Sequence, residues 1–212
     1  MTTINQPLLP TSQELTEYVY QSNAIEGYTP QEYGPGTRIF DQHLSAVEHA
    51  IEVLLWEPRV IHFRLMYGIL GPLEAGVWRR ENIYIGGSAA VSPGRHLLAH
   101  IEEWEARVIE GPPSGQGAED WCWEMHHWFE CIHPFVDGNG RTGRIILNVL
   151  RLKYGLPWLT IYVGAEQDSY YRAIQKYRKE FFVCSELRNK TRYREPKIFV
   201  ESTFRKGVAS ES

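Results

Sequence analysis

Apolar residues recur every three or four positions along most of the chain, which is the spacing of amphipathic helices. The clearest stripe lies on a helix expected over 118–132 and comprises Trp121, Met125, Trp128, Phe129 and Ile132. Another helix is expected to start at the glycine-rich turn after residue 137 and to end at Gly155. The remaining helices are expected over 11–26, 37–55, 58–70, 95–109, 166–187 and, as a short last one, 195–204.

One segment departs from the helical spacing. Within residues 82–92, Ile83, Tyr84 and Ile85 lead into Gly86 and Gly87, a pattern that predicts a short β-hairpin. A lone hairpin is marginally stable, so it must rest on helices, and its free edge can pair with another chain. The pattern therefore predicts a mainly α fold, a helical bundle with one small β-hairpin, in a single domain over 1–212.

The first helix carries its own start and stop signals. Thr11 or Ser12 can cap it, and Glu14 stands three residues after Thr11, as in a capping box. Gly27 is expected to end it. The helix therefore carries the Glu26 carboxylate to its C-terminal end.

The composition bounds the class of protein. The chain has 212 residues, is 43% hydrophobic and 13% aromatic, and carries a net charge of −4. These values predict a globular domain without a basic surface for nucleic acid or anionic membrane. No apolar run approaches the roughly 20 residues of a membrane span, and no signal peptide is expected at the N-terminus.

The cysteines bear on the compartment. Cys122, Cys131 and Cys184 form no C-x-x-C pair, and the first two lie on one expected helix, too far apart for a bridge. We expect three reduced, mostly buried thiols in a cytoplasmic protein with no nucleic-acid partner and no membrane partner.

The candidate chemistry lies in residues 133–144, HPFVDGNGRTGR. Gly138, Gly140 and Gly143 match G-x-G-x-x-G, but a dinucleotide fold needs a strand before this motif, and here a helix and His-Pro-Phe precede it. A Walker A loop is excluded because no Gly-Lys-Ser/Thr follows. The segment instead predicts an anion site at a helix N-terminus.

Side chains around this turn suit phosphate and proton chemistry. Arg141 and Arg144 are three residues apart on one helix and face the same side. Asp137 can hold a divalent metal, and His133 is a candidate general base. Because a proline follows His133, we expect it to be extended. The alternative is that His133 only caps the preceding helix and the arginines pair with surface acids.

The same twelve residues closely resemble the signature of the Fic (filamentation induced by cAMP) domain family, HPFx[D/E]GNGRxxR. The resemblance extends to the flap region at 76–80 and 83–87, to a later helix at 170–174, and to the [S/T]xxxE[G/N] inhibitory motif at 22–27. It covers about residues 11–185.

The resemblance implies a Fic-type helical bundle and transfer of AMP from ATP to a Ser, Thr or Tyr hydroxyl of a target protein. His133 would be the base, and Asp137 would bind Mg²⁺. Phosphates would be held by Gly138, Asn139, Gly140, Arg141 and Arg144, with the Asn139 side chain helping. The flap (Ile83, Tyr84, Ile85 and Gly86) would dock the target segment.

The resemblance also implies control by an N-terminal inhibitory helix over 11–27. Glu26, with Ser22 in the same motif, would pair with Arg144 and displace the ATP γ-phosphate. In some family members this glutamate positions a water that removes AMP, so removal is also open. Self-modification and a homodimer are both compatible with the sequence.

Several alternatives stay open. The fold could transfer phosphate, UMP or phosphocholine, or act as a nucleotide-binding toxin–antitoxin type module. A metalloprotein would use His96 with His100, or the cluster of His126, His127 and His133, although H-E-x-x-H is absent. Candidates for the adenine pocket are Tyr170, Tyr171 and Asn148. No winged helix is expected after residue 185, so fused DNA binding is not expected.

Overall fold

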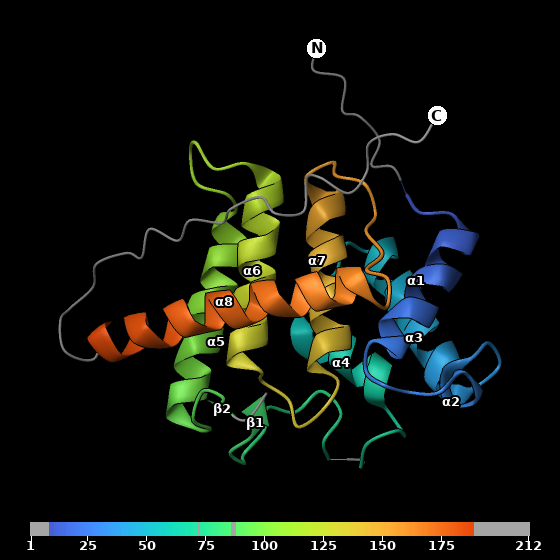
Figure 1. Cartoon of the computed structure of the whole chain (residues 1–212), viewed down its shortest axis with the longest axis horizontal. Coiled ribbons are helices and arrows are strands. Elements are labelled where there is room, and N and C mark those ends of the chain that lie inside the picture. Colours follow the sequence, from blue (N-terminus) through green and yellow to red (C-terminus); the bar gives the residue numbers. More distant parts are fainter. Residues whose placement is uncertain (1–8, 72, 86–87, 189–212) are drawn as a thin grey trace.

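The computed structural model describes residues 9–71, 73–85 and 88–188, and these residues form a mainly helical fold with one small hairpin (Figure 1). The prediction of a mainly α bundle is confirmed. The helix expected over 195–204 lies outside the described residues. The elements are α1 Ser12–Ala24, α2 Pro30–Tyr33, α3 Arg38–Glu52, α4 Pro58–Met66, β1 Tyr84–Ile85, β2 Ser88–Ala89, α5 Arg95–Glu110, α6 Ala118–Ile132, α7 Asn139–Lys153 and α8 Ala165–Arg188.

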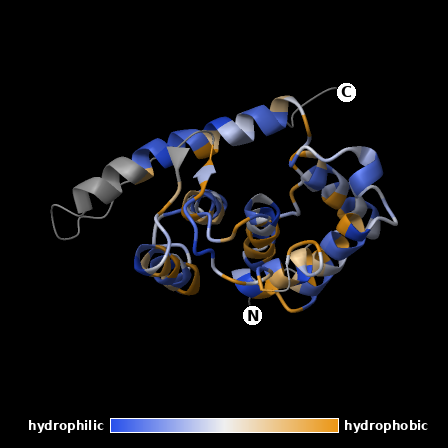
Figure 2. Ribbon diagram, turned by 90° about the horizontal axis from the view of Figure 1, so that it is seen from below, coloured by the Kyte–Doolittle hydropathy of each residue, from blue (hydrophilic) through white to orange (hydrophobic). Residues whose placement is uncertain are grey.

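Helices α6 and α7 form the centre of the bundle. They pack on each other, α5 covers α6, and α8 crosses the outside of all three (Figure 1). The predicted stripe of α6 is buried throughout, and so are Ile145, Ile146, Val149 and Leu150 of α7. In the view from below, α8 spans one side of the bundle and carries many hydrophilic residues along its length (Figure 2). The two central helices therefore fix the loop that joins them, which is the candidate site.

Helix α1 packs against α3 and α7. Its capping box forms as the sequence predicts: the Thr11 amide donates to Glu14 at 2.7 Å, and the Glu14 amide donates to the Thr11 hydroxyl at 3.2 Å. The helix ends at Ala24, two residues earlier than expected, because a turn leads into Gly27, whose φ is +83°. Glu26 consequently lies on this turn rather than on the helix.

The structure also contains a short helix that the sequence pattern did not predict. Helix α2 was missed, although Thr29 and Glu32 form a second capping box with Pro30 in the first helical position. On α5, Leu97 faces the core and Leu98 is 44% exposed, because the stripe follows the phase of Leu97, Ile101, Trp104 and Val108.

The hairpin lies at the end of the bundle where α6 turns into α7 (Figure 1). Tyr84 pairs with Ala89 and Ile85 with Ser88, antiparallel, and the Ala90 amide donates to the Ile83 carbonyl at 2.9 Å. The strands are shorter than the expected 82–92, and Gly86 lies outside the described residues. Arg178 of α8 donates to the Ile85 carbonyl at 3.1 Å, so a helix supports the hairpin.

Cys122 and Cys131 are free and buried, and burial raises the pKa of the Cys122 thiol to about 12. The side chain of Cys184 lies outside the described residues. Among the helices that the structure describes, none combines the length and the apolar character needed to cross a bilayer.

The capping box of α1 yields a prediction about stability. Thr11→Ala removes the side-chain cap and should lower the free energy of unfolding, measured by urea denaturation, by about 1 kcal/mol. Thr16→Ala is the control, because its hydroxyl only donates to the Ser12 carbonyl within the helix. Equal losses in the two variants would contradict the importance of the cap.

Candidate active site

The site is built on the loop between α6 and α7, which begins at His133. His133 is the C-terminal cap of α6: its amide donates to the Phe129 carbonyl at 2.9 Å, and its backbone is left-handed, with φ +50° and ψ +65°. The expectation of an extended His133 was therefore wrong. The proline rule disfavours the right-handed helical region, and ending α6 in the left-handed region avoids that region too. This conformation costs a residue with a side chain about 1–2 kcal/mol, so neighbouring groups must hold it.

The His133 ring is oriented for proton transfer. Its Nδ1 lies 3.3 Å from the backbone carbonyl of Glu130, which can only accept. In the neutral ring, Nδ1 therefore carries the hydrogen and Nε2 is left as an acceptor. Burial, helped by the nearby Arg79, lowers the pKa of His133 to about 4, against the effects of the Glu130 carbonyl and Glu26. His133 is consequently neutral at pH 7 and able to take a proton.

Asn139 closes the loop with its side chain. The Phe135 amide donates to Asn139 Oδ1 at 2.8 Å, and Asn139 Nδ2 donates to the Phe135 carbonyl at 2.9 Å. The side chain is almost completely buried. Both polar ends of this side chain thus help to fold the turn, and its expected help in phosphate binding stays a prediction.

Phe135 stacks with two other rings. The His62 ring lies with its centroid 3.7 Å from that of Phe135 at an interplanar angle of 5°, and the Trp78 ring lies at 4.9 Å. The Gly76 amide donates to His62 Nδ1 at 2.8 Å, so Nε2 carries the hydrogen and donates to the Asp137 carbonyl at 2.9 Å. His62 thus holds the turn, and burial lowers its pKa to about 4.

Gly138 and Asp137 shape the start of α7. Gly138 has φ +73°, and a Cβ there would lie 2.8 Å from Met66 Sδ, so glycine is required. Its amide, expected to face phosphate, donates to Asp137 Oδ1 at 2.6 Å. The next amides of α7, from Asn139 to Arg141, have no acceptor within the helix and are the ones oriented for an anion.

Arg144 is buried and held by the last turn of α1 and by the turn that follows it. Its Nε donates to the Ser22 hydroxyl at 2.9 Å, and its Nη2 donates to the Ser22 carbonyl at 2.8 Å and to Glu26 Oε1 at 2.6 Å. Burial opposes the charge of Glu26, but Arg144 holds the pKa of that carboxyl below its usual value. A Cβ on Gly140 would lie 2.6 Å from Glu26 Oε1, so the absence of a side chain there makes room for the pair.

Arg141 is almost fully buried and lies over the Tyr28 ring, 5.2 Å from its centroid. Its Nη2 is 3.8 Å from Asp137, while its Nε and Nη1 have no hydrogen-bond partner among the described residues. Buried donors of this kind normally find an acceptor, so Arg141 is prepared for a bound anion.

Asp137 is the candidate metal ligand. Its side chain is 52% exposed, and the residue stands on the turn that leads into α7. One exposed carboxylate suits Mg²⁺, which proteins often hold through one or two carboxylates together with substrate phosphates. No group of three His, Cys, Asp or Glu side chains that could hold a metal occurs in the part of the chain that the structure describes.

Glu130 is a buried acid that sequence reasoning missed. Its carboxylate lies 3.9 Å from His133 Nδ1 and 4.0 Å from His126 Nε2. Burial raises the pKa of Glu130 to about 8, so it is mostly protonated at neutral pH. It lies among the buried residues of α6, and no sequence motif marks it.

The adenine-pocket candidates separate into buried and exposed side chains. Tyr170 is buried, with its hydroxyl 2.9 Å from His126 Nε2, and Asn148 is held by the backbone of Leu159. Both are structural. Tyr171 is 38% exposed and donates to the Ile25 carbonyl at 3.2 Å, so it alone of the three lies at the surface beside Glu26.

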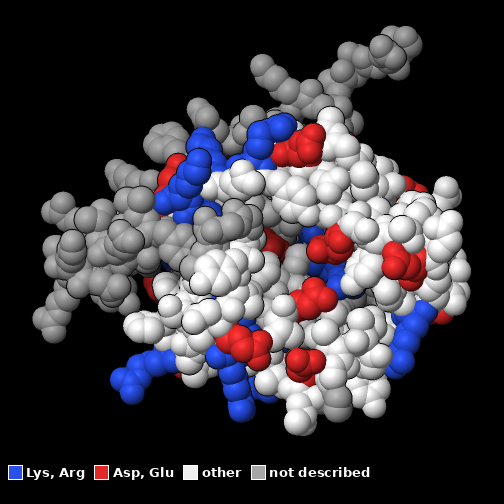
Figure 3. Space-filling view, turned by 60° about the horizontal axis from the view of Figure 1, so that its bottom comes forward, with Lys and Arg blue, Asp and Glu red and all other residues white. Residues whose placement is uncertain are grey.

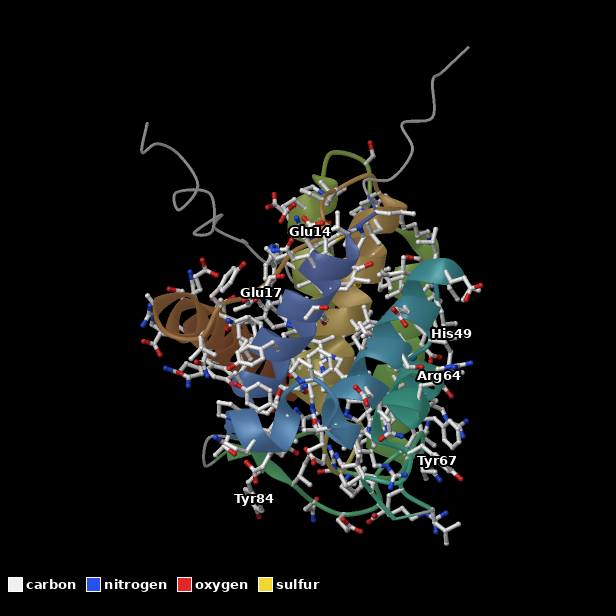
Figure 4. All side chains as sticks on the ribbon, turned by 90° about the vertical axis from the view of Figure 1, so that its right-hand side faces the viewer. Glu14, Glu17, His49, Arg64, Tyr67 and Tyr84 are labelled. Carbon is white, nitrogen blue, oxygen red and sulfur yellow. The ribbon has the colours of Figure 1, made fainter. Side chains whose placement is uncertain are left out.

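The end of the molecule that carries this loop is hollowed, and Lys or Arg atoms lie inside the hollow beside Asp and Glu atoms (Figure 3). Tyr84 of the hairpin points outward at the same end (Figure 4), and it is 72% exposed. A charged hollow and an exposed strand thus share one face.

Comparison with known proteins identifies the family. Residues 55–150 match the Fic/DOC family. The chain is 31% identical over 162 residues to a protein of Drosophila virilis named Protein adenylyltransferase Fic, an alignment covering 74% of this chain. The chain belongs to the Fic/DOC family. A relative of the same name in Drosophila ananassae is 29% identical over 160 residues. The chain spans about a third of the length of these relatives, 32% and 31%.

Solved structures share the fold. Fic-1 from C. elegans has a TM-score of 0.57 at 22% identity, with 81% of this chain and 60% of that one covered. A Fic domain containing signaling protein from Bacteroides thetaiotaomicron has a TM-score of 0.58 at 17% identity, with 77% and 71% covered.

The buried histidines predict acid sensitivity. Burial lowers the pKa of each member of a set of five histidines, namely His43, His62, His126, His127 and His133. Since an unfolded histidine titrates near 6.5, the unfolded chain takes up these protons first, and stability is lost as the pH falls from about 6.5 towards 4. Because the pKa of Glu130 is raised in the folded chain, its protonation increases stability as the pH falls, but this is one group against five histidines.

We expect the midpoint of thermal unfolding to fall by at least about 5 °C between pH 7 and pH 5. His96→Ala, which removes an exposed histidine, should follow the same profile. A midpoint that stays level or rises at pH 5 would contradict the buried neutral rings.

Proposed function

We propose that the protein is an adenylyltransferase that moves AMP from ATP to a Ser, Thr or Tyr hydroxyl of a target protein. One observation carries the proposal: His133, with Nε2 left as acceptor, stands on the turn that leads directly into the first amides and two buried arginines of α7. A base next to a phosphate cradle is what nucleotidyl transfer needs. The names of the relatives support the same chemistry.

In this reaction His133 Nε2 takes the proton of the target hydroxyl while that oxygen attacks the α-phosphorus. The new P–O bond forms as the bond from the α-phosphorus to the bridging oxygen of the β-phosphate breaks, and pyrophosphate leaves. The depressed pKa of His133 keeps it unprotonated before the target arrives. Negative phosphates beside it would favour the imidazolium as the proton moves.

The triphosphate would be neutralised by the start of α7. The amides from Asn139 to Arg141 and the open donors of Arg141 would face its oxygens. Asp137 would hold Mg²⁺, which supplies charge neutralisation between phosphates. Arg144 would take the terminal end once Glu26 releases it.

Glu26 makes the segment 11–27 an inhibitory element in this proposal. The carboxylate occupies Arg144 Nη2 at 2.6 Å, where a terminal phosphate oxygen would otherwise bind. Because the Glu26 side chain is 26% exposed and follows the end of α1, it can leave without unfolding the core. The pair therefore restrains the reaction rather than blocking it permanently.

The hairpin would dock the target. Its strands are short, and Tyr84 is exposed, so an extended target segment can add to the edge and bring its hydroxyl towards His133. Ile83 and Ile85, which flank Tyr84 in the sequence, are half-buried.

The first test concerns the base. His133→Ala should lower transfer of labelled AMP by at least about 100-fold, the usual contribution of a general base. ATP affinity, measured by calorimetry, should change less than twofold because Arg141 and the α7 amides remain. His96→Ala is the control, since it makes the same change on the surface. Undiminished transfer in His133→Ala would refute the assignment.

The second test concerns the restraint. Glu26→Ala should raise transfer of AMP, either to the chain itself or to proteins of a lysate, by about tenfold or more, because it frees the Arg144 fork. Glu17→Ala is the matched control on α1, where Glu17 only accepts from Gln21. Mass spectrometry of the product distinguishes AMP from phosphate, UMP or phosphocholine. Equal rates for the two variants would refute the inhibitory role.

A further inference from the structure

Arg79 lies between α4 and the hairpin, and it is almost completely buried without a carboxylate partner among the ion pairs of the described residues. Its guanidinium binds backbone carbonyls instead. Nε donates to the His133 carbonyl at 2.7 Å, Nη1 to Glu81 at 2.8 Å, and Nη2 to Ile132 at 3.3 Å and to Val91. A further bond runs from the Arg79 amide to the Pro134 carbonyl at 2.9 Å.

These acceptors belong to two functional parts of the molecule. Ile132, His133 and Pro134 form the end of α6 and the start of the catalytic turn. Glu81 and Val91 flank the hairpin on its two sides, since β1 begins at Tyr84 and β2 ends at Ala89. One planar group therefore joins the base to both ends of the element that would receive the target.

The arrangement answers two physical needs of the turn. The last carbonyls of α6 have no partner within the helix, and a cation is favourable at a helix C-terminus. The left-handed His133 backbone costs energy and must be held by its surroundings. Arg79 meets both needs, and only a planar fork with five donors can reach carbonyls on separate segments at once.

We propose that Arg79 is a positioning residue that couples the hairpin to the general base, so that docking of a target and placement of His133 are set together. The role in transfer rests on the proposed function. The mechanical coupling does not, because it follows from the hydrogen bonds alone.

The structural half is tested on the full chain by amide hydrogen exchange. Three amides report on it: Arg79 itself, Ala90, which donates to the Ile83 carbonyl, and Phe135, which donates to Asn139. In the unaltered chain these amides should open with one common free energy. In Arg79→Lys, which keeps the charge but loses the fork, all three should exchange at least about tenfold faster while amides of α7 do not.

Arg151→Lys is the matched control, because Arg151 is also almost completely buried and its Nε donates to one backbone carbonyl, that of Pro157 at 3.0 Å, at the end of α7 opposite to the turn. It should leave the three amides unchanged. Faster exchange at only one of the two segments, or at neither, would overturn the coupling. If Arg79→Lys does not fold, unequal opening energies in the unaltered chain would overturn it instead.

The catalytic half of the proposal is tested by measuring transfer of labelled AMP from ATP. The enzyme is the Glu26→Ala chain. The acceptor is a second copy that carries both Glu26→Ala and His133→Ala, and its concentration is varied. Adding Arg79→Lys to the enzyme copy should lower kcat and raise KM for the acceptor, each by about tenfold, with the dissociation constant for ATP changed less than twofold. Unchanged kcat and KM would refute a role in positioning. Absence of transfer in the background itself would count against the proposed function, while the exchange result still decides the coupling.

Discussion

The arrangement of the site follows from how the buried charge of Arg144 is paired. Arg144 lies inside the bundle on α7, where leaving its charge unpaired would be costly. Glu26 supplies the counter-charge from a segment more than a hundred residues away, and Ser22 accepts hydrogen bonds from Nε and Nη2. This pairing anchors the end of α1 against α7 and requires a glycine at position 140. In the proposed function the same guanidinium would bind a terminal phosphate, so the contact that stabilises the resting state would also compete with the substrate.

The turn beside Arg144 is held by buried side chains from other elements. His62 from α4 holds the Asp137 carbonyl, Arg79 holds the end of α6, and Asn139 closes the loop on Phe135. Each uses side-chain groups to satisfy backbone groups that a turn leaves without partners. The result is a preorganised surface, in which few groups need to move when charge develops on a phosphate.

Much of this was accessible from the sequence because it depends on local patterns. The apolar stripe of α6, the capping box of α1 and the twelve-residue turn each have a short-range signature, and the first two appear in the structure where expected. What escaped prediction depends on distant partners. Nothing local marks His62 or Arg79 as supports of the turn, since their acceptors are more than fifty residues away. The sequence also did not show that the Asn139 side chain bonds to the Phe135 backbone, because that contact depends on how the loop closes. The left-handed His133 reflects the end of a long helix, which a rule about one neighbouring proline does not describe.

In the proposed function, Glu26 and the terminal phosphates of ATP compete for Arg144. Calorimetric affinities of the unaltered chain and Glu26→Ala for ATP and for AMP test it most directly, since AMP lacks the phosphates that would reach the arginine. Glu26→Ala should tighten ATP binding by about tenfold or more and change AMP binding less than twofold. An equal change for both nucleotides, or no change for ATP, would contradict the competition.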